Sequence, residues 1–297
     1  MSLASLADLL AQTLRISVPY ILAALGGLLC ERAGVINIAL EGLLLVGAFV
    51  GAVVARESAS AVFGIAGGIA AGMTLAAIYG MAVIRLRADQ IVCGVAVTLL
   101  ASGMTRFFLK LIYHSASNSP RIPALDSSLQ LGASALVVLA AVLAVHLVLQ
   151  HTRTGLRLRT AGEHPEAARA QGIAVGPLRW QGVLASGALA GLGGVWLAFD
   201  QHQFVAGMSA GRGYVALAAM ILGGWRPLGA ALGCLLFAGA EALELRLQSS
   251  AGVLHGVLAP GTVQAIPYIA TLIALVLRPR GAIPPQALGR PLDDTET

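Results

Sequence analysis

Residues 131–149, LGASALVVLAAVLAVHLVL, decide the fold class of this chain. They contain no Asp, Glu, Lys or Arg, and apart from Ser134 and His146 their side chains are apolar or absent. A helix of this length is about 28 Å long, which matches the roughly 30 Å hydrocarbon core of a bilayer. The stretch therefore predicts a membrane-spanning α-helix.

The composition of the whole chain agrees with a membrane protein. Hydrophobic residues make up 57% of the 297 positions and charged residues 11%, against about 25% charge in a typical soluble domain. So few charges could not cover a soluble surface, which excludes a soluble enzyme or a nucleic-acid-binding domain. The net charge is +5, and most of the charged residues lie between apolar runs. Their placement therefore indicates how the chain is oriented in the membrane rather than a nucleic-acid-binding surface.

Further apolar runs extend the prediction to most of the chain. Runs long enough to span occur at 16–30, 36–55, 61–84, 91–113, 181–199, 227–245 and 262–277. Two shorter runs, 213–224 and 251–259, would reach only about 18 Å and 13 Å as helices. Such pieces are tolerated at membrane depth only where protein or a water-filled cavity covers their ends. We expect an all-α membrane protein, a polytopic bundle of about 8–10 transmembrane helices with broken or re-entrant half-helices.

Glycine spacing predicts that these helices pack closely. Gly64 and Gly68, and the run Gly187, Gly191, Gly193 and Gly194, place small residues at intervals that let helix backbones approach in lipid. We expect a single transmembrane domain over residues 1–278. The polar, proline-rich segment 279–297 is expected to be a disordered cytoplasmic tail.

Arginine placement predicts the orientation, because positively charged loops stay on the cytoplasmic side. The arginines cluster in the loop 150–180, in the connection 85–90 and in the tail, with the hairpin loop 114–130 then outside. Counting spans places the N-terminus outside, unless one early segment is broken or re-entrant. We favour a broken early segment, which would place the N-terminus inside.

The loop between the apolar runs 131–149 and 181–199 is predicted to contain one short helix. Residues 151–180 read HTRTGLRLRTAGEHPEAARAQGIAVGPLRW. Pro165 suits a first helical turn, Glu166 favours the positive end of the helix dipole, and Gly172 is a natural terminator. An alanine-faced helix exposed in this loop would fit a groove in another protein. A plain surface loop with one helical turn is the alternative that these residues leave open.

The motif Glu166-Ala167-Ala168-x-x-x-Gly172 resembles the Glu-Ala-Ala loop of permease subunits in ATP-binding-cassette importers. Two other stretches, 31–42 (ERAGVINIALEG) and 211–230 (GRGY to GGWRPLGA), are similar to the branch that imports simple sugars and nucleosides. The Ile-x-Leu-Pro continuation found in some importer families is absent here. The resemblance implies that the loop docks on an ATPase subunit through Gly162, Glu163, Pro165, Glu166, Ala167, Ala168, Arg169 and Gly172.

The same resemblance implies the partners and the cellular location. It implies ATP-binding-cassette ATPase subunits, a second permease subunit that is homologous or identical, and an extracytoplasmic solute-binding protein, all at the bacterial inner membrane. The form of the stretch 31–42 looks most like nucleoside-type permeases, so we favour nucleosides over simple sugars. No Gly-x-x-x-x-Gly-Lys-Ser/Thr motif occurs, so ATP would have to bind another chain.

Three polar residues at membrane depth are candidates for the translocation path: Asn37, Glu41 and Tyr214. Asn37 and Glu41 are four residues apart, which places them on one face if the segment is helical. Flanking Gly34 and Gly42 would suit a broken helix. Either these side chains line or shape the path, or they pair with a neighbouring helix and fix its packing. Tyr214 is the second residue of the short run 213–224, which we expect to line the cavity.

Other reactive side chains favour structural roles. Glu241 and Glu244 form a pair three residues apart, which we interpret as a helix-end ion pair or interfacial group. His146 is expected to be packed or hydrogen-bonded, and the three widely spaced cysteines to be small core residues. We expect no metal, no cofactor and no catalytic residue.

Two other functions compete with the importer. A self-sufficient secondary transporter or channel would have to use Glu41 for coupling, since no chain of Asp, Glu and His follows one helix. A membrane-embedded enzyme would have to use Glu241 and Glu244 as an acid–base pair. It would also need a nucleophile or metal site, which the sequence does not show.

Overall fold

The computed structural model describes residues 3–122, 127–249, 269, 276 and 283–290. In this part of the chain the secondary structure is helical, apart from one isolated β-bridge between Asn118 and Val205. The elements are α1 (Leu3–Arg32), α2 (Leu40–Glu57), α3 (Ala61–Gly80), the π-helical turn η1 (Met81–Arg85), α4 (Gln90–Tyr113), α5 (Ser127–His151), α6 (Arg153–Glu163), α7 (Pro165–Ala170), α8 (Val175–Asp200), α9 (Arg212–Leu222) and α10 (Pro227–Ser249).

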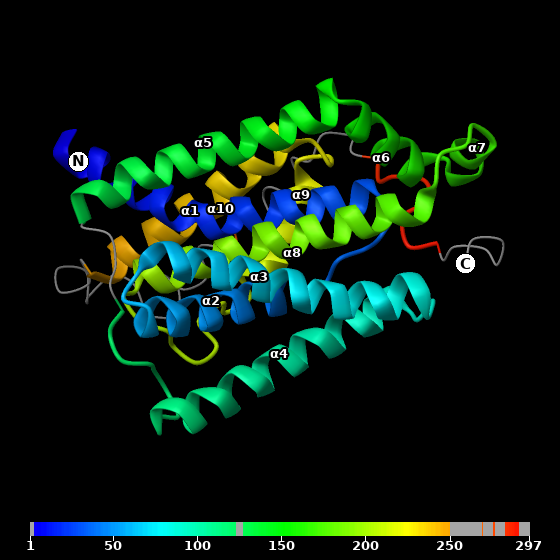
Figure 1. Cartoon of the computed structure of the whole chain (residues 1–297). Helices are drawn as coiled ribbons and strands as arrows, with labels where there is room; N and C mark the ends of the chain where they lie inside the picture. The colour runs from blue at the N-terminus through cyan, green and yellow to red at the C-terminus, as the bar shows by residue number, and fades with distance from the viewer. Residues whose placement is uncertain (1–2, 123–126, 250–268, 270–275, 277–282, 291–297) are drawn as a thin grey trace.

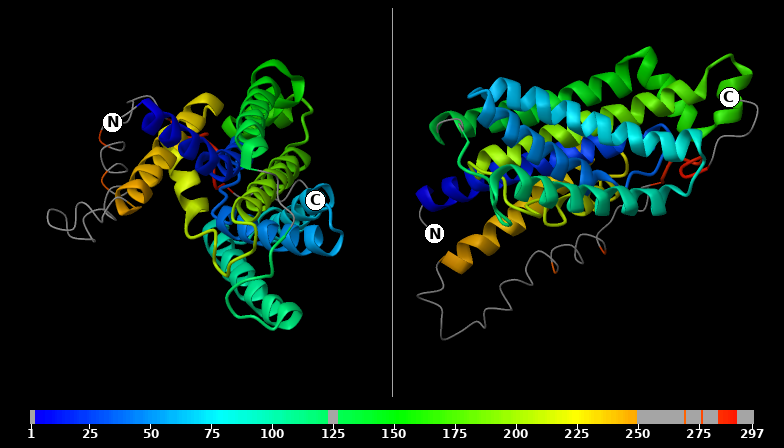
Figure 2. Two further views of the ribbon diagram at one scale, coloured as in Figure 1. Left: turned by 90° about the vertical axis from the view of Figure 1, so that its left-hand side faces the viewer. Right: turned by 60° about the horizontal axis from the view of Figure 1, so that its bottom comes forward.

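The long helices run roughly side by side and form an elongated bundle (Figure 1). α1 and α8 lie at its centre and are mostly buried, whereas α4 and α5 lie at its edges and expose most of their surface (Figure 2). Among the described residues, six helices are long and apolar enough to cross a membrane. The all-α, polytopic fold predicted from the apolar runs is therefore confirmed.

Glycines bring the central helices into backbone contact, as their spacing predicted. A Cβ atom added to Gly47 of α2 would lie 2.5 Å from the Gly191 Cα of α8. On the other side of α8, a Cβ on Gly187 would lie 2.5 Å from the Gly72 carbonyl oxygen of α3. In lipid, where apolar burial does not drive helix association, such close packing supplies much of the attraction. Larger residues at these positions would separate α2, α3 and α8.

The six described helices that could cross a membrane contain the expected spans 16–30, 61–84, 91–113, 131–149, 181–199 and 227–245, but not the expected span 36–55. The run 36–55 is not helical from its start, because residues 33–39 form a non-helical break and α2 begins only at Leu40. The short run 213–224 is the 11-residue helix α9, reached through a second non-helical segment, residues 201–211. The predicted runs 251–259 and 262–277 lie almost entirely outside the described residues.

The N-terminal end of α1 lies at the opposite end of the bundle from α7 (Figure 1). Arg15 bonds Asp200 at the end of α8, whereas Arg32 bonds Glu163 at the end of α6. The expectation of an N-terminus on the same side as the loop 150–180 is therefore wrong. The early segment is broken, but the break follows a complete α1, so no crossing is lost.

Residues 283–290 lie against the α6 end of the bundle (red in Figure 1). Ala287 is only 1% exposed, and its N–H donates a 2.9 Å hydrogen bond to the Gly162 carbonyl. The expectation of a disordered tail over 279–297 therefore does not hold for these eight residues. Pro285 and Ala287 are buried against the bundle, whereas Ile283, Pro284, Gln286 and Arg290 are exposed. The rest of that tail lies outside the described residues.

Candidate functional site

The loop between α5 and α8 folds into two short helices at one end of the bundle. α6 begins after Thr152, whose hydroxyl accepts a 3.0 Å hydrogen bond from the Gly155 N–H. α7 begins with Pro165, where a missing N–H costs no helical bond. Beyond its end, Gly172 has φ +74° and donates a 2.8 Å bond to the Arg169 carbonyl, a usual helix termination. The short helix predicted from Pro165 and Gly172 is confirmed as α7, whereas α6 before it was not predicted.

α7 presents an open surface that faces away from the bundle. Glu166, Ala167 and Ala170 are exposed, whereas Ala168 is 3% exposed and packs into the hydrophobic core. The helix is thus anchored by one face and free on the other. Among the other residues predicted for docking, Gly172 is exposed, Gly162 is buried, and Glu163, Pro165 and Arg169 are half-buried.

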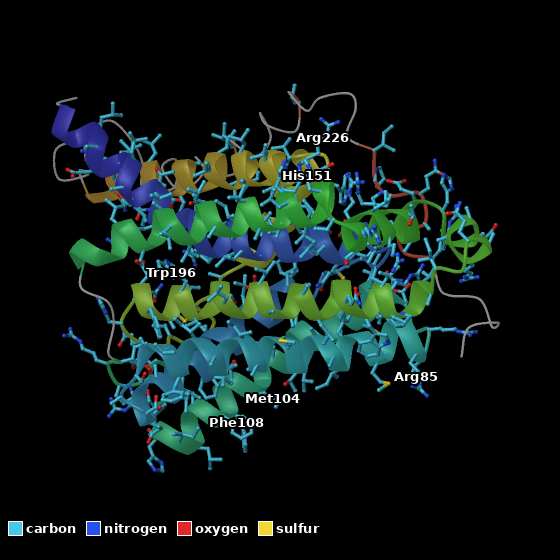
Figure 3. All side chains as sticks on the ribbon, turned by 45° about the horizontal axis from the view of Figure 1, so that its top comes forward. Arg85, Met104, Phe108, His151, Trp196 and Arg226 are labelled. Atoms are coloured by element: carbon cyan, nitrogen blue, oxygen red, sulfur yellow. The ribbon has the colours of Figure 1, made fainter. Side chains whose placement is uncertain are left out.

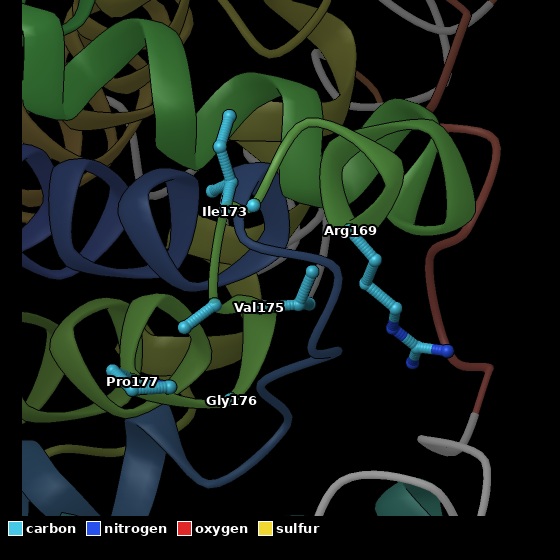
Figure 4. A pocket seen from close by; sticks show the side chains of 7 residues that line it. Arg169, Ile173, Val175, Gly176 and Pro177 are labelled. Atoms are coloured by element: carbon cyan, nitrogen blue, oxygen red, sulfur yellow. The ribbon is translucent and has the colours of Figure 1, made fainter.

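A groove adjoins α7 where the chain turns into α8 (Figure 4). Its volume is about 390 Å³, and its lining is Arg169, Gly172, Ile173, Ala174, Val175, Gly176 and Pro177. Arg169 is the charged residue of this lining, and the other six are apolar or glycine. Arg85 and Arg226 also lie toward this end of the bundle (Figure 3). This agrees with the orientation predicted from the positively charged loops.

The stretches 31–42 and 211–230, far apart in the sequence, lie against each other. The Trp225 indole N–H donates a 2.6 Å bond to the Glu31 carboxylate, and the Arg32 guanidinium donates bonds of 2.8 and 3.0 Å to the Trp225 carbonyl. Arg32 also forms a 3.2 Å ion pair with Glu163, two residues before α7 begins. The end of α1 therefore contacts both the α9–α10 turn and the α6–α7 loop.

The break at residues 33–39 is held by side chains of three neighbouring helices. Asn37 donates a hydrogen bond to the Ser186 hydroxyl of α8, and the Tyr79 hydroxyl of α3 donates one to the Ile36 carbonyl. The Ile36 N–H donates a 2.8 Å bond to the Gln90 side chain of α4. Because residues 33–39 are not helical, Asn37 and Glu41 do not share a helix face, and that expectation is wrong.

Glu41, in the first turn of α2, joins the two breaks. Its carboxylate oxygens accept hydrogen bonds from the backbone N–H groups of Gly211 (2.8 Å) and Gly213 (2.7 Å), at the start of α9. Gly213 has no room for a Cβ, which would collide with the Glu41 backbone. Glu41 is 8% exposed and Asn37 fully buried. Both therefore shape the interior rather than face open space, whereas Tyr214 is 43% exposed.

A smaller pocket lies toward the end of the bundle opposite α7. It has a volume of about 140 Å³, and its lining combines apolar side chains with one charged residue each from α1, α8, α9 and α10. Arg212 and Glu241 form a 2.5 Å ion pair, and Tyr20 donates a 2.7 Å bond to the same carboxylate. Arg15 and Asp200 form a second pair at 2.7 Å.

Glu241 forms an ion pair, as interpreted for the pair Glu241 and Glu244, but its cation is Arg212 of α9 rather than a residue of α10. Glu244 instead accepts a 2.8 Å bond from Gln248. Half-buried His146 lies with its ring 6.0 Å from that of His151. Within the described part of the chain, no three metal-ligating side chains gather.

Sequence reasoning missed the residues that connect the sites to one another. Arg32, Trp225 and Arg212 lie inside the two stretches that carried the resemblance, yet the bonds among Glu31, Arg32, Glu163, Arg212, Trp225 and Glu241 join residues 29 to 194 positions apart. A charged residue beside a glycine-rich break was the available signal, because a charge at that depth requires a partner. Which partner it finds depends on the packing.

Comparison with known proteins identifies similar chains. Residues 9–276 match the family model described as the permease component of branched-chain amino acid transport systems. The guanosine ABC transporter permease protein NupQ of Bacillus subtilis is 37% identical, with 94% of each chain covered. The nucleoside ABC transporter permease protein NupC of Lactococcus lactis is 35% identical over 95% of each. The putative glucose ABC transporter permease protein TsgC13 of Haloferax volcanii is 34% identical over 91% of each. No solved structure matches.

Proposed function

We propose that this chain, which belongs to the family of permease components of branched-chain amino acid transport systems, conducts a nucleoside through an ATP-driven importer. It is a multi-pass permease subunit of the inner membrane. The nucleoside assignment is supported by the activities for which NupC and NupQ are named. A simple sugar, as named for TsgC13, is the alternative solute.

A second, non-identical permease is the proposed partner in the membrane. Three organisms supply two relatives each: NupQ with NupP, NupC with NupB, and TsgC13 with TsgB13. This chain is 37% identical to NupQ but 26% identical to NupP. The relatives thus divide into two kinds of permease. This chain would be a permease of one kind, and its partner would be a permease of the other kind. An extracytoplasmic binding protein would deliver the solute.

The observation that carries the proposal is the exposed face of α7. Its alanine side chains are small, buried Ala168 holds the helix against the bundle, and the 390 Å³ groove adjoins it. We therefore propose that the ATPase subunit docks on this surface. Gly162, Glu163, Pro165, Glu166, Ala167, Ala168, Arg169 and Gly172 would form or support the contact. When ATP binding closes two ATPase subunits on each other, the docked α7 helices would move and the bundles would alternate access.

The path for the solute would pass the broken helices. Non-helical backbone at membrane depth is tolerated where it is buried in protein or borders a cavity, and transporters bind solutes at such places. Asn37 and Glu41 would shape the path by fixing the breaks, and exposed Tyr214 would line it. The alternative, a self-sufficient transporter, would need a free coupling charge, but both oxygens of Glu41 are already bonded to α9.

The proposal is tested first by purifying the tagged protein from its own membranes and identifying what accompanies it. Recovery of an ATPase subunit and a second permease, with ATP-dependent nucleoside uptake after reconstitution, is the expected result. Uptake by the isolated chain in liposomes without any ATPase would overturn it. Uptake of glucose but not of nucleosides would leave the importer and replace the solute.

Glu166→Arg tests the docking surface. Reversing an exposed charge on a contact face places like charges or an unpaired charge in the interface. We expect uptake to be abolished and less ATPase to co-purify, while membrane insertion stays normal. Glu57→Arg, an exposed charge reversal at the other end of the bundle, is the matched control. Normal uptake by Glu166→Arg would count against the coupling role of α7.

A further inference from the structure

We infer that residues 286–290 form a coupling clamp, which joins the α6–α7 loop to the break at residues 33–39. This inference rests on the proposed function and names a further positioning element for it. The clamp is the described C-terminal segment that passes beside α6 in Figure 1. It would transmit movement of α7 to the middle of the bundle.

Four hydrogen bonds attach the clamp to three separate parts of the molecule. The Ala287 N–H bonds the Gly162 carbonyl at 2.9 Å, and the Gln286 N–H bonds the Glu163 carboxylate at 3.2 Å, both at the end of α6. The Gly289 N–H bonds the Gly34 carbonyl at 3.2 Å, in the break. The Arg179 guanidinium of α8 donates a 2.8 Å bond to the Arg290 carbonyl.

The clamp is buried at Ala287 and partly buried at Leu288 and Gly289, whereas Gln286 and Arg290 are exposed. Ala287 is 1% exposed, Pro285 is also buried, and Leu288 packs against the main hydrophobic core. A Cβ on Gly289, which has φ +79°, would lie 2.9 Å from the Ile36 side chain. Close-packed contacts of this kind transmit displacement instead of absorbing it.

Gly34 marks the point where these elements meet. Its φ is +91°, and a Cβ there would lie within 3.5 Å of Arg179, Ala287 and Gly162 together. A Cβ on Gly162 would in turn collide with the Arg32 carbonyl group. The end of α6, the start of the break, α8 and the clamp therefore contact one another directly.

Glu163 connects the clamp to α7. One of its carboxylate oxygens accepts from Arg32 at 3.2 Å, and the other accepts from the Gln286 N–H at 3.2 Å. The helix α7 begins two residues later at Pro165. At the other end of the route, the break leads from Gly34 to Glu41, which holds the start of α9. Displacement of α7 would thus reach α9 through two short, tightly bonded segments.

The clamp gives a testable distinction between coupling and anchoring. An anchor affects how much complex folds, so uptake and ATP hydrolysis fall together. A coupling element affects solute imported per ATP hydrolysed, a ratio that does not depend on the amount of folded complex. Coupling between sites is worth about 5- to 150-fold, so a loss should be measurable in that ratio.

The first experiment compares two truncations in the purified, reconstituted importer. One ends after Ile283 and removes the clamp, and the matched control ends after Arg290 and keeps it. We expect the first to retain ATPase subunits and basal ATP hydrolysis while uptake per ATP falls at least about fivefold, and the second to match the wild type. An unchanged ratio after removal of the clamp, or a parallel loss of uptake and assembly, would overturn the inference.

A gentler pair of variants removes one bond without removing the segment. Residues 285–288 form a turn closed by a 3.1 Å bond from the Leu288 N–H to the Pro285 carbonyl, so Gln286 occupies a turn position that favours proline. Gln286→Pro deletes the N–H that bonds Glu163, whereas Gln286→Ala keeps it. We expect about a twofold lower uptake per ATP for Gln286→Pro alone. Equal ratios in the two variants would contradict a role for this bond.

These outcomes separate the clamp from the proposed function. If the wild-type protein brings down no ATPase and transports without ATP, the proposed function fails and the clamp with it. If wild-type uptake is ATP-driven but the truncation after Ile283 leaves the ratio unchanged, only the clamp fails.

Discussion

Ile36, in the middle of the first break (residues 33–39), is bonded by side chains of neighbouring helices, whereas His202 and Phe204 of the second break (residues 201–211) are bonded mainly by the backbone of another loop. Tyr79 and Gln90 reach Ile36 in the first. In the second, the N–H groups of Ser119 and Ile122 bond the carbonyls of Phe204 (2.8 Å) and His202 (3.0 Å). The Ser119 hydroxyl adds an acceptor for the Phe204 N–H at 2.9 Å.

This difference shows two ways to satisfy non-helical backbone within a membrane domain. Every unpaired N–H or C=O at that depth costs several kcal/mol, so each break must find partners. Partners that are side chains make the first break dependent on residue identity. Partners that are mostly backbone make the second dependent on the position of the loop 115–122. Glu41 belongs to both, because it follows the first break and bonds the end of the second.

Glu41→Ala should have the largest effect, because it removes the joint between the breaks. The N–H groups of Gly211 and Gly213 would lose their acceptors, at about 1–3 kcal/mol each, so we expect stability to fall by about 2–6 kcal/mol. Uptake should change while ATPase docking is retained. The measurement is the thermal unfolding midpoint of the purified protein, together with uptake.

Glu41→Gln is the control for that variant, since its amide oxygen can still accept one of the two bonds. It should fall between the wild type and Glu41→Ala. If Glu41→Ala unfolds at the wild-type temperature and transports at the wild-type rate, the joint has no role in either stability or transport.

Tyr79→Phe should have an intermediate effect on the first break. The ring stays packed, but the Ile36 carbonyl loses its donor, so we expect a loss of about 1 kcal/mol. Tyr113→Phe is the matched control, because the buried Tyr113 hydroxyl has no hydrogen-bond partner in the described structure. Removing that hydroxyl should be neutral or slightly stabilising. Thermal midpoints that order the two variants the other way would refute side-chain control of the first break.

Asn118→Ala should have the smallest effect, because it tests the second break at an exposed side chain. Its amide makes a 3.3 Å bond to the Gln203 side chain, and the backbone bonds on either side of it remain. We expect a change in stability within about 0.5 kcal/mol. A loss as large as that of Tyr79→Phe, measured in the same unfolding assay, would mean that side chains also specify the second break.

The long helices, the half-helix α9 and the α7 helix could be predicted because each depends on neighbours along the chain. Long apolar runs predict α5 and α8, and a short apolar run predicts α9. Pro165 and Gly172 predict the limits of α7. Asn37 shows where that reasoning ends: four-residue spacing from Glu41 suggests one helix face, but the break is stabilised by Ser186, Tyr79 and Gln90 from other helices.

Hydrophobic length and charge are local sums, so the order of residues is enough to specify the fold class and the two glycine-rich stretches around the breaks. Packing of the helices decided the side of the N-terminus and the burial of Ala287. It also decided the partners of Glu41 and Glu163. Glu41 bonds residues 170 and 172 positions away, and Glu163 bonds one 131 positions away. Such pairs form only where two segments approach each other in space, and residue spacing within one segment carries no information about that approach.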